Sequence, residues 1–370
     1  MKWAWHLGRP FGIDVYIHAT FTLLLLWVGV SAYAATGTLA GAAGGIVFII
    51  LVFATVVLHE FGHALTARRF GIATRDITLL PIGGVARLER MPEKPAQEML
   101  VALAGPAVNA VIAAVLYLWL VATGRPLVVD EAQWFDAATL PTRLLWVNVM
   151  LAGFNLVPAF PMDGGRVLRA ALALRGDYLW ATQTAARLGQ AIALLLGVFG
   201  LFFNPLLTFV ALFVWIGAAA EASAVQARSA LEGVPVEAAM VTRFEALRAD
   251  DPLAAAAAQL LAGSQVDFPV LEDGVLVGIL TRAALIDGLT HRGPQARVSE
   301  AMVRKFETAH PRELLAGVFA RLQQCDCHSA PVVADGRVVG VVTMENVGEL
   351  MLIKDALRTK PGAGGAAPAA

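Results

Sequence analysis

Two histidines four residues apart, with a glutamate between them, lie at the end of a long apolar stretch: His59-Glu60-Phe61-Gly62-His63. On a helix, residues i and i+4 share a face, so His59 and His63 can present their imidazoles to one metal ion. Zinc binds neutral imidazole readily, and a catalytic zinc site keeps one position for water. Glu60 is placed to accept a proton from that water. The spacing therefore predicts a catalytic zinc site.

A pair of core histidines with a chance glutamate is the alternative interpretation, since isolated matches to this pattern occur in soluble chains. Here, however, the three ionisable residues fall inside a hydrophobic stretch. At membrane depth such residues are costly unless they have a function. The zinc site is therefore the favoured interpretation.

Two imidazoles leave zinc short of a protein ligand, and a carboxylate can supply the third. Asp163 follows an apolar run, after Pro158 and Pro161 and directly before Gly164 and Gly165. The prolines stop regular helix, and the glycines allow a sharp turn. Irregular backbone at membrane depth is tolerated only when it is buried in protein or lines a wet cavity. From the residues alone, Asp163 also fits a simple turn aspartate. The remaining histidines are poorly placed, being near the N-terminus or in the charged C-terminal part: His6, His18, His291, His310 and His328.

The elements that must position these residues are membrane spans. Of 370 residues, 58% are hydrophobic and 15% are charged, and residues 1–220 carry 25 of the 57 charged side chains. A wholly soluble globule, a disordered chain and a disulfide scaffold are excluded. Uncharged runs long enough to cross a bilayer predict six spans, with a turn at 37–45 and a break at Asn204-Pro205. The runs are residues 15–59 (two spans), 99–124, 144–162 and 188–220 (two spans).

Lysine and arginine predict the orientation of these spans. With a cytoplasmic N-terminus, the opposite side receives only Arg125 and Arg143. Six spans also return the charged C-terminal part to the cytoplasm. The net charge of −1 gives no indication of nucleic-acid binding. The cytoplasmic side receives Lys2, Arg9, Arg68, Arg69, Arg75, Arg87, Arg90, Lys94, Arg166, Arg169, Arg175 and Arg187.

These motifs together resemble the site-2 protease family of intramembrane zinc metalloproteases. The resemblance covers about residues 1–222. It implies one zinc ion held by His59, His63 and Asp163, with Glu60 as the catalytic base. The reaction implied is hydrolysis of a peptide bond in or near the transmembrane segment of a membrane protein. The motifs that carry it are His59-Glu60-x-x-His63, Asn155-x-x-Pro158-x-x-Pro161-x-Asp163-Gly164-Gly165, Ala104-Gly105-Pro106-x-x-Asn109 and Trp3-x-x-x-x-Gly8-Arg9-x-Phe11-Gly12-Ile13.

The resemblance also implies substrate-binding roles. Asn155 would help to hold the substrate strand near the metal, although an asparagine in a broken span also fits capping of exposed backbone. Residues 77–86 are expected to form short extended pieces around Gly83-Gly84. In relatives, a membrane-dipping hairpin here can pair with an unwound substrate, which amounts to strand addition. An ordinary interfacial loop is the alternative. The substrate class implied is a single-span membrane protein such as an anti-sigma factor.

The C-terminal part is an internal repeat with an offset of 62 residues. Pro269 and Gly278 match Pro331 and Gly340, and the Asp-Gly pair at 273–274 recurs at 335–336. Each unit is expected to contain an initial strand, a helix, two strands around the Asp-Gly turn and a closing helix. Two such units resemble a tandem pair of cystathionine-β-synthase-type (CBS) domains. Such pairs commonly bind adenine nucleotides and often associate face to face, which would make a homodimer.

A ribose-binding pattern of that family is present as Gly340-x-x-Thr343-x-x-Asn346, which predicts ATP or AMP bound through Thr343 and Asn346. In the first repeat, Ala284 occupies the position of Asn346, so at most one site keeps the contact. A purely structural or dimerising pair is the alternative.

The fold class expected is a polytopic α-helical membrane protein with a cytoplasmic α/β CBS pair, located in the plasma membrane. A transporter gated by the CBS pair is the rival function. It gives no reason for a glutamate between two histidines at helical spacing, and the spans show no inverted repeat. A metal-free relative that only binds substrates is a third hypothesis, which the intact motif residues disfavour. The expected domains are 1–222 (protease), 223–235 (linker), 236–290 and 298–355 (CBS domains) and 356–370 (disordered tail).

Overall fold

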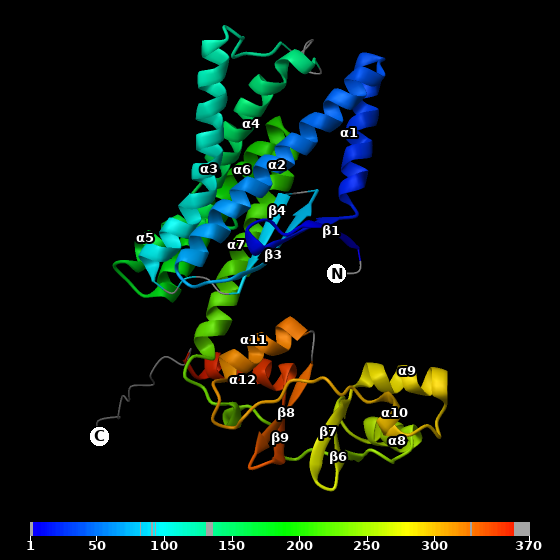
Figure 1. Ribbon diagram of the computed structural model, residues 1–370. Coiled ribbons are helices and arrows are strands. Elements are labelled where there is room, and N and C mark those ends of the chain that lie inside the picture. Colours follow the sequence, from blue (N-terminus) through cyan, green and yellow to red (C-terminus); the bar gives the residue numbers. More distant parts are fainter. Residues whose placement is uncertain are drawn as a thin grey trace, which may run out of the picture. The chain divides into compact units, whose positions relative to one another are not determined.

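The structure is a computed structural model that describes residues 3–81, 83–89, 92, 94–130, 136–325 and 328–358. The chain divides into two compact units, with the boundary between Val225 and Gln226 (Figure 1). Each unit has its own hydrophobic clusters, and each is described by itself below.

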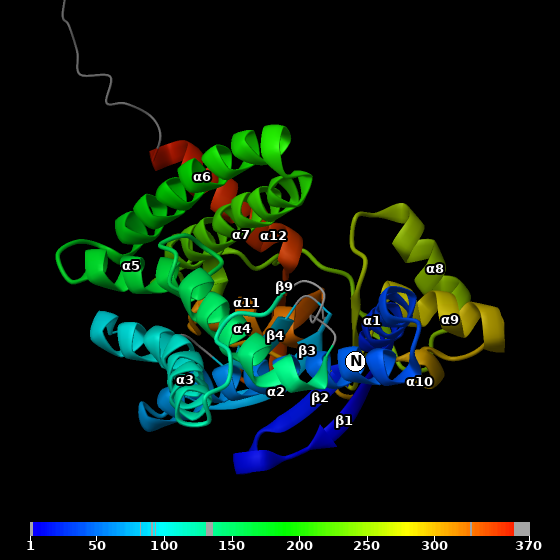
Figure 2. The same cartoon turned by 90° about the horizontal axis from the view of Figure 1, so that it is seen from above.

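The first unit is a helical bundle with one small sheet. Figure 2 shows α6 and α7 together on the side of the bundle opposite α2. Helix α3 packs against α2, α4 and α5, so it lies at the centre of the contacts. The helices are α1 (Phe21–Thr36), α2 (Leu39–Arg69), α3 (Pro95–Ala122), α4 (Leu140–Asn155), α5 (Asp163–Ala173), α6 (Tyr178–Phe203) and α7 (Pro205–Ala230).

The turn between α1 and α2 is much shorter than the predicted 37–45 segment. Only Gly37, in the left-handed conformation with φ 68°, and Thr38, whose side chain caps α2, separate the two helices. Gly41 and Gly45 lie inside α2. A Cβ on Gly45 would stand 2.9 Å from the Cβ of Ala32 on α1. These glycines therefore permit close packing of two helices rather than a turn.

Within the described part of the chain, four helices (α2, α3, α6 and α7) are long and apolar enough to cross a membrane. The predicted break at Asn204-Pro205 is confirmed, because α6 ends at Phe203 and α7 starts at Pro205. Helices α1 and α4 have 16 residues each, or about 24 Å at 1.5 Å per residue, less than the bilayer core. The count of six spans therefore stays a prediction for α1 and α4.

A four-stranded sheet in the order β1-β2-β3-β4 lies beside α2. Strands β2 and β3 pair in parallel, and the other neighbours are antiparallel. The predicted hairpin is present as β3 and β4, but Gly83 and Gly84 begin β4 instead of forming the turn. Strands β1 and β2 were not predicted. Phe61 and Ala64 of α2 pack against Ile77 of β3, which ties the sheet to the helix that carries the two histidines. The strands are β1 (Ala4–Gly8), β2 (Asp14–His18), β3 (Thr74–Leu80) and β4 (Gly83–Leu88).

The second unit consists of the two predicted repeats. Both Asp-Gly turns are confirmed, with positive φ at Asp273 and Gly274 (49° and 80°) and at Asp335 and Gly336 (50° and 76°), as a type I′ hairpin requires. The elements are β5 (Leu247–Arg248), α8 (Leu253–Ala262), β6 (Phe268–Glu272), β7 (Val275–Leu280), α9 (Arg282–Arg292), α10 (Val298–Ala301), α11 (Leu315–Cys325), β8 (Ser329–Ala334), β9 (Arg337–Thr343) and α12 (Met344–Arg358).

The initial segments of the repeats cross over. Met302, at the start of the second repeat, packs on Gly278 of the first, and Met240, at the start of the first, packs on Gly340 of the second. The predicted initial strand is only two residues long in the first repeat.

The predicted linker (223–235) and the predicted disordered tail (356–370) are both partly helical. Residues 223–230 continue α7 as helix. Of the predicted tail, 356–358 belong to α12 and 359–370 lie outside the described residues.

Candidate metal centre

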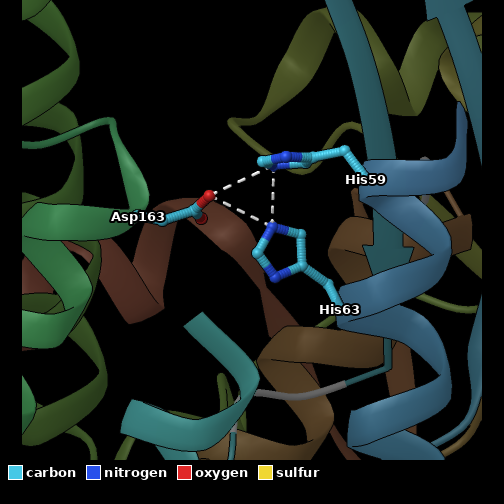
Figure 3. A group of neighbouring side chains, drawn as sticks. All are labelled: His59, His63 and Asp163. Carbon is cyan, nitrogen blue, oxygen red and sulfur yellow. Dashed lines mark hydrogen bonds and ion pairs between the residues drawn. The ribbon is translucent and has the colours of Figure 1, made fainter. Parts of the chain in front are cut away.

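Three buried side chains converge between α2 and the start of α5 (Figure 3). Nε2 of His59 and Nε2 of His63 lie 3.1 Å apart. Oδ2 of Asp163 lies 3.2 Å from the first nitrogen and 3.1 Å from the second. The side chains are at most 10% exposed. Among the described residues, this is the one group of three His, Cys, Asp or Glu side chains with ligand atoms this close.

The hydrogen bonds behind the imidazoles fix their tautomers. His63 Nδ1 lies 2.7 Å from the carbonyl oxygen of Val101, which can only accept a hydrogen bond. His59 Nδ1 lies 2.5 Å from Oδ1 of Asn109. Both Nδ1 atoms therefore carry the proton in the neutral rings, and both Nε2 lone pairs point at the same place as Asp163.

Three acceptor atoms facing one another repel unless a cation lies between them. In tetrahedral zinc geometry, with ligand bonds of about 2.0–2.1 Å, ligand atoms stand about 3.3 Å apart. The 3.1–3.2 Å triangle matches that size. The donor set of two imidazoles and one carboxylate is also that of a catalytic zinc site with one position left for water. The three residues thus fit the metal that the sequence predicts.

Helix α3 supports both histidines. Its motif Ala104-Gly105-Pro106-x-x-Asn109 contributes to the family resemblance, but the sequence predicted no role for these residues. Asn109 is fully buried, and its amide donates to Oδ1 of Asn148 on α4 at 2.8 Å. This orients Oδ1 of Asn109 toward His59. Partners of this kind fix the ring and increase its basicity as a ligand. The sequence signal that could have found it is an amide side chain in an apolar helix.

Gly105 of α3 is the second residue whose role was missed. A Cβ at this position would stand 2.3 Å from Nε2 of His63 and 2.6 Å from Nε2 of His59. Only a residue without a side chain permits α3 to pass this close to the two Nε2 atoms. The glycine is thus part of the site through the space it leaves.

Asp163 is presented by the irregular segment between α4 and α5. It is the first residue of α5. A Cβ on Gly164 would stand 2.3 Å from the carbonyl oxygen of Val157, and one on Gly165 would stand 2.6 Å from the backbone nitrogen of Phe160. The glycines thus permit the first turn of α5 to press against the preceding loop. The glycines were expected to allow a sharp turn after the carboxylate; instead both lie in the first turn of α5, and neither has a positive φ.

Glu60 lies on the sheet side of the same helix. Its Oε2 accepts a hydrogen bond from the backbone N–H of Ala86 on β4 at 3.2 Å. A Cβ on Gly84 would stand 2.9 Å from Cγ of Glu60, so the absence of a side chain at 84 makes room for the glutamate. The start of β4 therefore lies against the residue next to the first histidine.

The remaining predicted residues have local contacts. Asn155 is the last residue of α4, and its amide donates to the carbonyl of Leu151 at 2.9 Å, which is the backbone-capping alternative. Thr343 and Asn346 are brought together at the start of α12: Thr343 donates to Oδ1 of Asn346 at 2.5 Å and accepts from its backbone N–H at 3.1 Å. In the first repeat, Thr281 makes only the second kind of contact, with Ala284.

Comparison with known proteins identifies both units. Peptidase family M50 matches residues 47–139 and 128–198, and the CBS domain matches residues 236–291 and 298–352. The chain is 35% identical over 286 residues to the zinc metalloprotease MJ0392 of Methanocaldococcus jannaschii, covering 76% of this chain and 78% of that protein. It is 29% identical to the putative zinc metalloprotease Rip3 of Mycobacterium tuberculosis, covering 95% and 93%. The solved site-2 protease from Methanocaldococcus jannaschii is 38% identical, covering 60% of this chain and 95% of that chain with a TM-score of 0.44.

A relative of this identity and coverage, together with the matches to both family profiles, decides the family. The chain belongs to peptidase family M50, the site-2 proteases, and is a helical membrane zinc metallopeptidase with a C-terminal pair of CBS domains.

Proposed function

We propose that this protein is an intramembrane protease that hydrolyses a peptide bond in or near the transmembrane segment of a single-span membrane protein, such as an anti-sigma factor. His59, His63 and Asp163 would hold one Zn²⁺, and Glu60 would be the catalytic base. The observation that carries the proposal is the convergence of two Nε2 lone pairs with a carboxylate oxygen from the start of α5, within 3.2 Å. The two histidines lie on α2, a helix apolar enough to span a membrane. Membership of a peptidase family removes the transporter alternative.

When bound, zinc supplies a Lewis acid that polarises the scissile carbonyl and lowers the pKa of water. Glu60 directly follows the ligand His59 and takes the proton from the attacking water, then gives it to the leaving amine. The hydrogen bond from Ala86 holds one oxygen of Glu60 at 3.2 Å. In this proposal the second oxygen would exchange the proton.

Strand β4 supports a mode of substrate binding. It is an edge strand of the sheet, and the backbone N–H of its residue Ala86 donates a hydrogen bond to Glu60. A substrate helix hides its carbonyls in internal hydrogen bonds, so it must unwind before cleavage. An unwound segment added along the edge that starts at Gly83 and Gly84 would pass beside Glu60. Asn155, at the end of α4, would hold the substrate strand.

The proposed location is the plasma membrane, with the N-terminus and the CBS pair in the cytoplasm. Arg68 and Arg69 end α2 only five and six residues after His63. At 1.5 Å per residue the site lies about 8 Å from that end. The positive-inside rule places this end on the cytoplasmic side, from which water would enter.

One experiment tests this proposal directly. The full-length protein with zinc is reconstituted in bilayers with a single-span protein, and the same span sequence is also offered as a soluble fusion without lipid. Cleavage positions are read by mass spectrometry. We expect cuts in or next to the span, in the bilayer only. Equal cleavage of the soluble fusion, or cuts only in distant soluble regions, would contradict the proposal.

The CBS pair is proposed to modulate cleavage by binding ATP or AMP through Thr343 and Asn346. Their pairing at the start of α12 supports this site. The exposed apolar side chains of Leu352, Ile353 and Leu357 on α12 support association of two copies through this module.

For nucleotide binding we expect one site per chain, because Ala284 replaces the asparagine in the first repeat. The variant Asn346→Ala is expected to lower the affinity for AMP about tenfold, because one hydrogen bond to a ribose hydroxyl is lost. Calorimetric titration of the full-length protein measures this, with the exposed Asn204→Ala as the control. Wild-type affinity in Asn346→Ala, or cleavage rates that are identical with and without AMP, would contradict the respective part of the proposal.

A further inference from the structure

Arg169 on α5 is a buried charge that the zinc site does not use. Its side chain is 1% exposed. Nε donates to Oε1 of Glu98 at 2.8 Å, Nη2 donates to the same oxygen, and Nη1 donates to Oε1 of Glu221 at 2.7 Å. The guanidinium also lies 5.0 Å from the ring centroids of Phe160 and Tyr178. One side chain thus joins α5 to α3 and α7.

The two helices joined by Arg169 and Glu98 are α5, which carries the proposed ligand Asp163, and α3, whose residues support the two histidines of α2. Glu98 is on α3, and the residues that support the histidines follow it at i+3, i+7 and i+11: Val101, Gly105 and Asn109. This spacing places them on the face of α3 that carries Glu98. On the other side, Asp163 begins the helix of Arg169, six residues away or about 9 Å along the axis. The ion pair therefore links the supports of the imidazoles to the third ligand.

Stability alone does not account for such a cluster. A buried ion pair loses the hydration of both charges, and its replacement by apolar side chains of similar size is often neutral or stabilising. The forked geometry of a guanidinium, in contrast, fixes two helices in one relative position. Asp163 needs that precision, because the loop before it is irregular and its carboxylate must meet two nitrogens from another helix.

We propose that Arg169 is a positioning residue: through its ion pair with the buried Glu98 it fixes Asp163 relative to His59 and His63. Glu221, whose side chain is 29% exposed, adds α7 as a third attachment. The inference rests on the proposed zinc site and deepens it.

The test compares the zinc affinity of full-length variants, measured by competition with a chelator. Arg169→Lys keeps the charge but loses the fork. We expect the zinc affinity to fall by about 10–100-fold, the range found when supporting residues of metal sites are altered. At saturating zinc, kcat on a single-span substrate should fall while KM stays near the wild-type value. Arg175→Lys, an exposed arginine just after α5, is the matched control and should resemble the wild type.

A second variant separates positioning from folding. Glu98→Gln/Arg169→Met/Glu221→Gln removes all three charges, so neither carboxylate is left without the guanidinium of Arg169. Weak zinc binding in a triple variant with native circular dichroism supports the proposal. Wild-type zinc affinity in the triple variant would overturn it even if Arg169→Lys binds weakly, because unpaired carboxylates would then explain the lysine variant. Wild-type affinity and kcat in Arg169→Lys would overturn it as well.

The same measurements distinguish this inference from the proposed function. If the wild type binds zinc but cleaves no membrane substrate, the proposed function fails. The ranking of zinc affinities still decides the role of Arg169.

Discussion

Replacing Glu60 by glutamine should abolish most cleavage without removing the metal. The amide has nearly the same size but cannot accept the proton of the attacking water, and general-base catalysis is worth about 10²–10⁴-fold in rate. The proposed ligands His59, His63 and Asp163 are untouched, so zinc content should stay at one ion per chain. The measurements are the single-turnover cleavage rate in bilayers and the zinc content of the same preparation.

Glu89→Gln is the matched control, since Glu89 is an exposed glutamate of the same unit and its loss should leave the rate unchanged. A Glu60→Gln variant that holds zinc and cuts at the wild-type rate would remove Glu60 from the mechanism. If the wild-type protein itself holds no zinc, the assignment of the three ligands fails, whatever the rates are.

The variant Gly105→Ala is expected to lose zinc and activity together. The added Cβ would stand 2.3 Å and 2.6 Å from the two Nε2 atoms, far inside contact distance. Either the rings rotate out of the triangle or α3 moves away and takes the carbonyl of Val101 and the amide of Asn109 with it. Both movements disturb the ligands, so zinc should bind at least about 100-fold more weakly, at the upper end of the effects of altered supporting residues. Chelator competition measures this.

Gly153→Ala controls for the general effect of a methyl group on an apolar helix. Gly153 is on α4, and among the described residues no atom beyond the neighbouring backbone of its own helix lies within 4 Å of its ideal Cβ position. This variant should therefore bind zinc and cleave as the wild type does. Normal zinc affinity in Gly105→Ala would show that α3 is not held as close to the imidazoles as the structure has it.

Several of the proposed functional residues could be predicted from the sequence because their roles depend on the spacing of residues close together in the chain. Histidines at i and i+4 share a helix face in any protein, and an Asp-Gly pair between two apolar strands favours one hairpin geometry. The repeat offset of 62 residues and the break at Asn204-Pro205 are equally local signals. The supporting residues Gly105 and Asn109 belong to a motif that carried the family resemblance, but their spacing predicted no role for them. The role of Gly105 depends on how closely α3 approaches the two histidines of α2.

Local signals also misled where a residue type serves two purposes. Gly41 and Gly45 were assigned to a turn but pack α2 against α1. Gly83 and Gly84 were assigned to the tip of a hairpin but begin β4, where Gly84 makes room for Glu60. A glycine can serve a turn or a close approach, and the sequence does not distinguish them because the approaching partner is distant in the chain.

Composition, periodicity and motifs of a few residues predicted the membrane-like first unit, the duplicated second unit and the proposed zinc chemistry of the first. The folded chain adds that Asp163, a hundred residues from His63, meets both imidazoles within 3.2 Å. It also shows that one face of α3 supports them, and that Arg169 joins that helix to α5. The physical reason is that a metal site needs atoms placed to within a few tenths of an ångström, and such precision arises from the packing of helices that are distant in sequence.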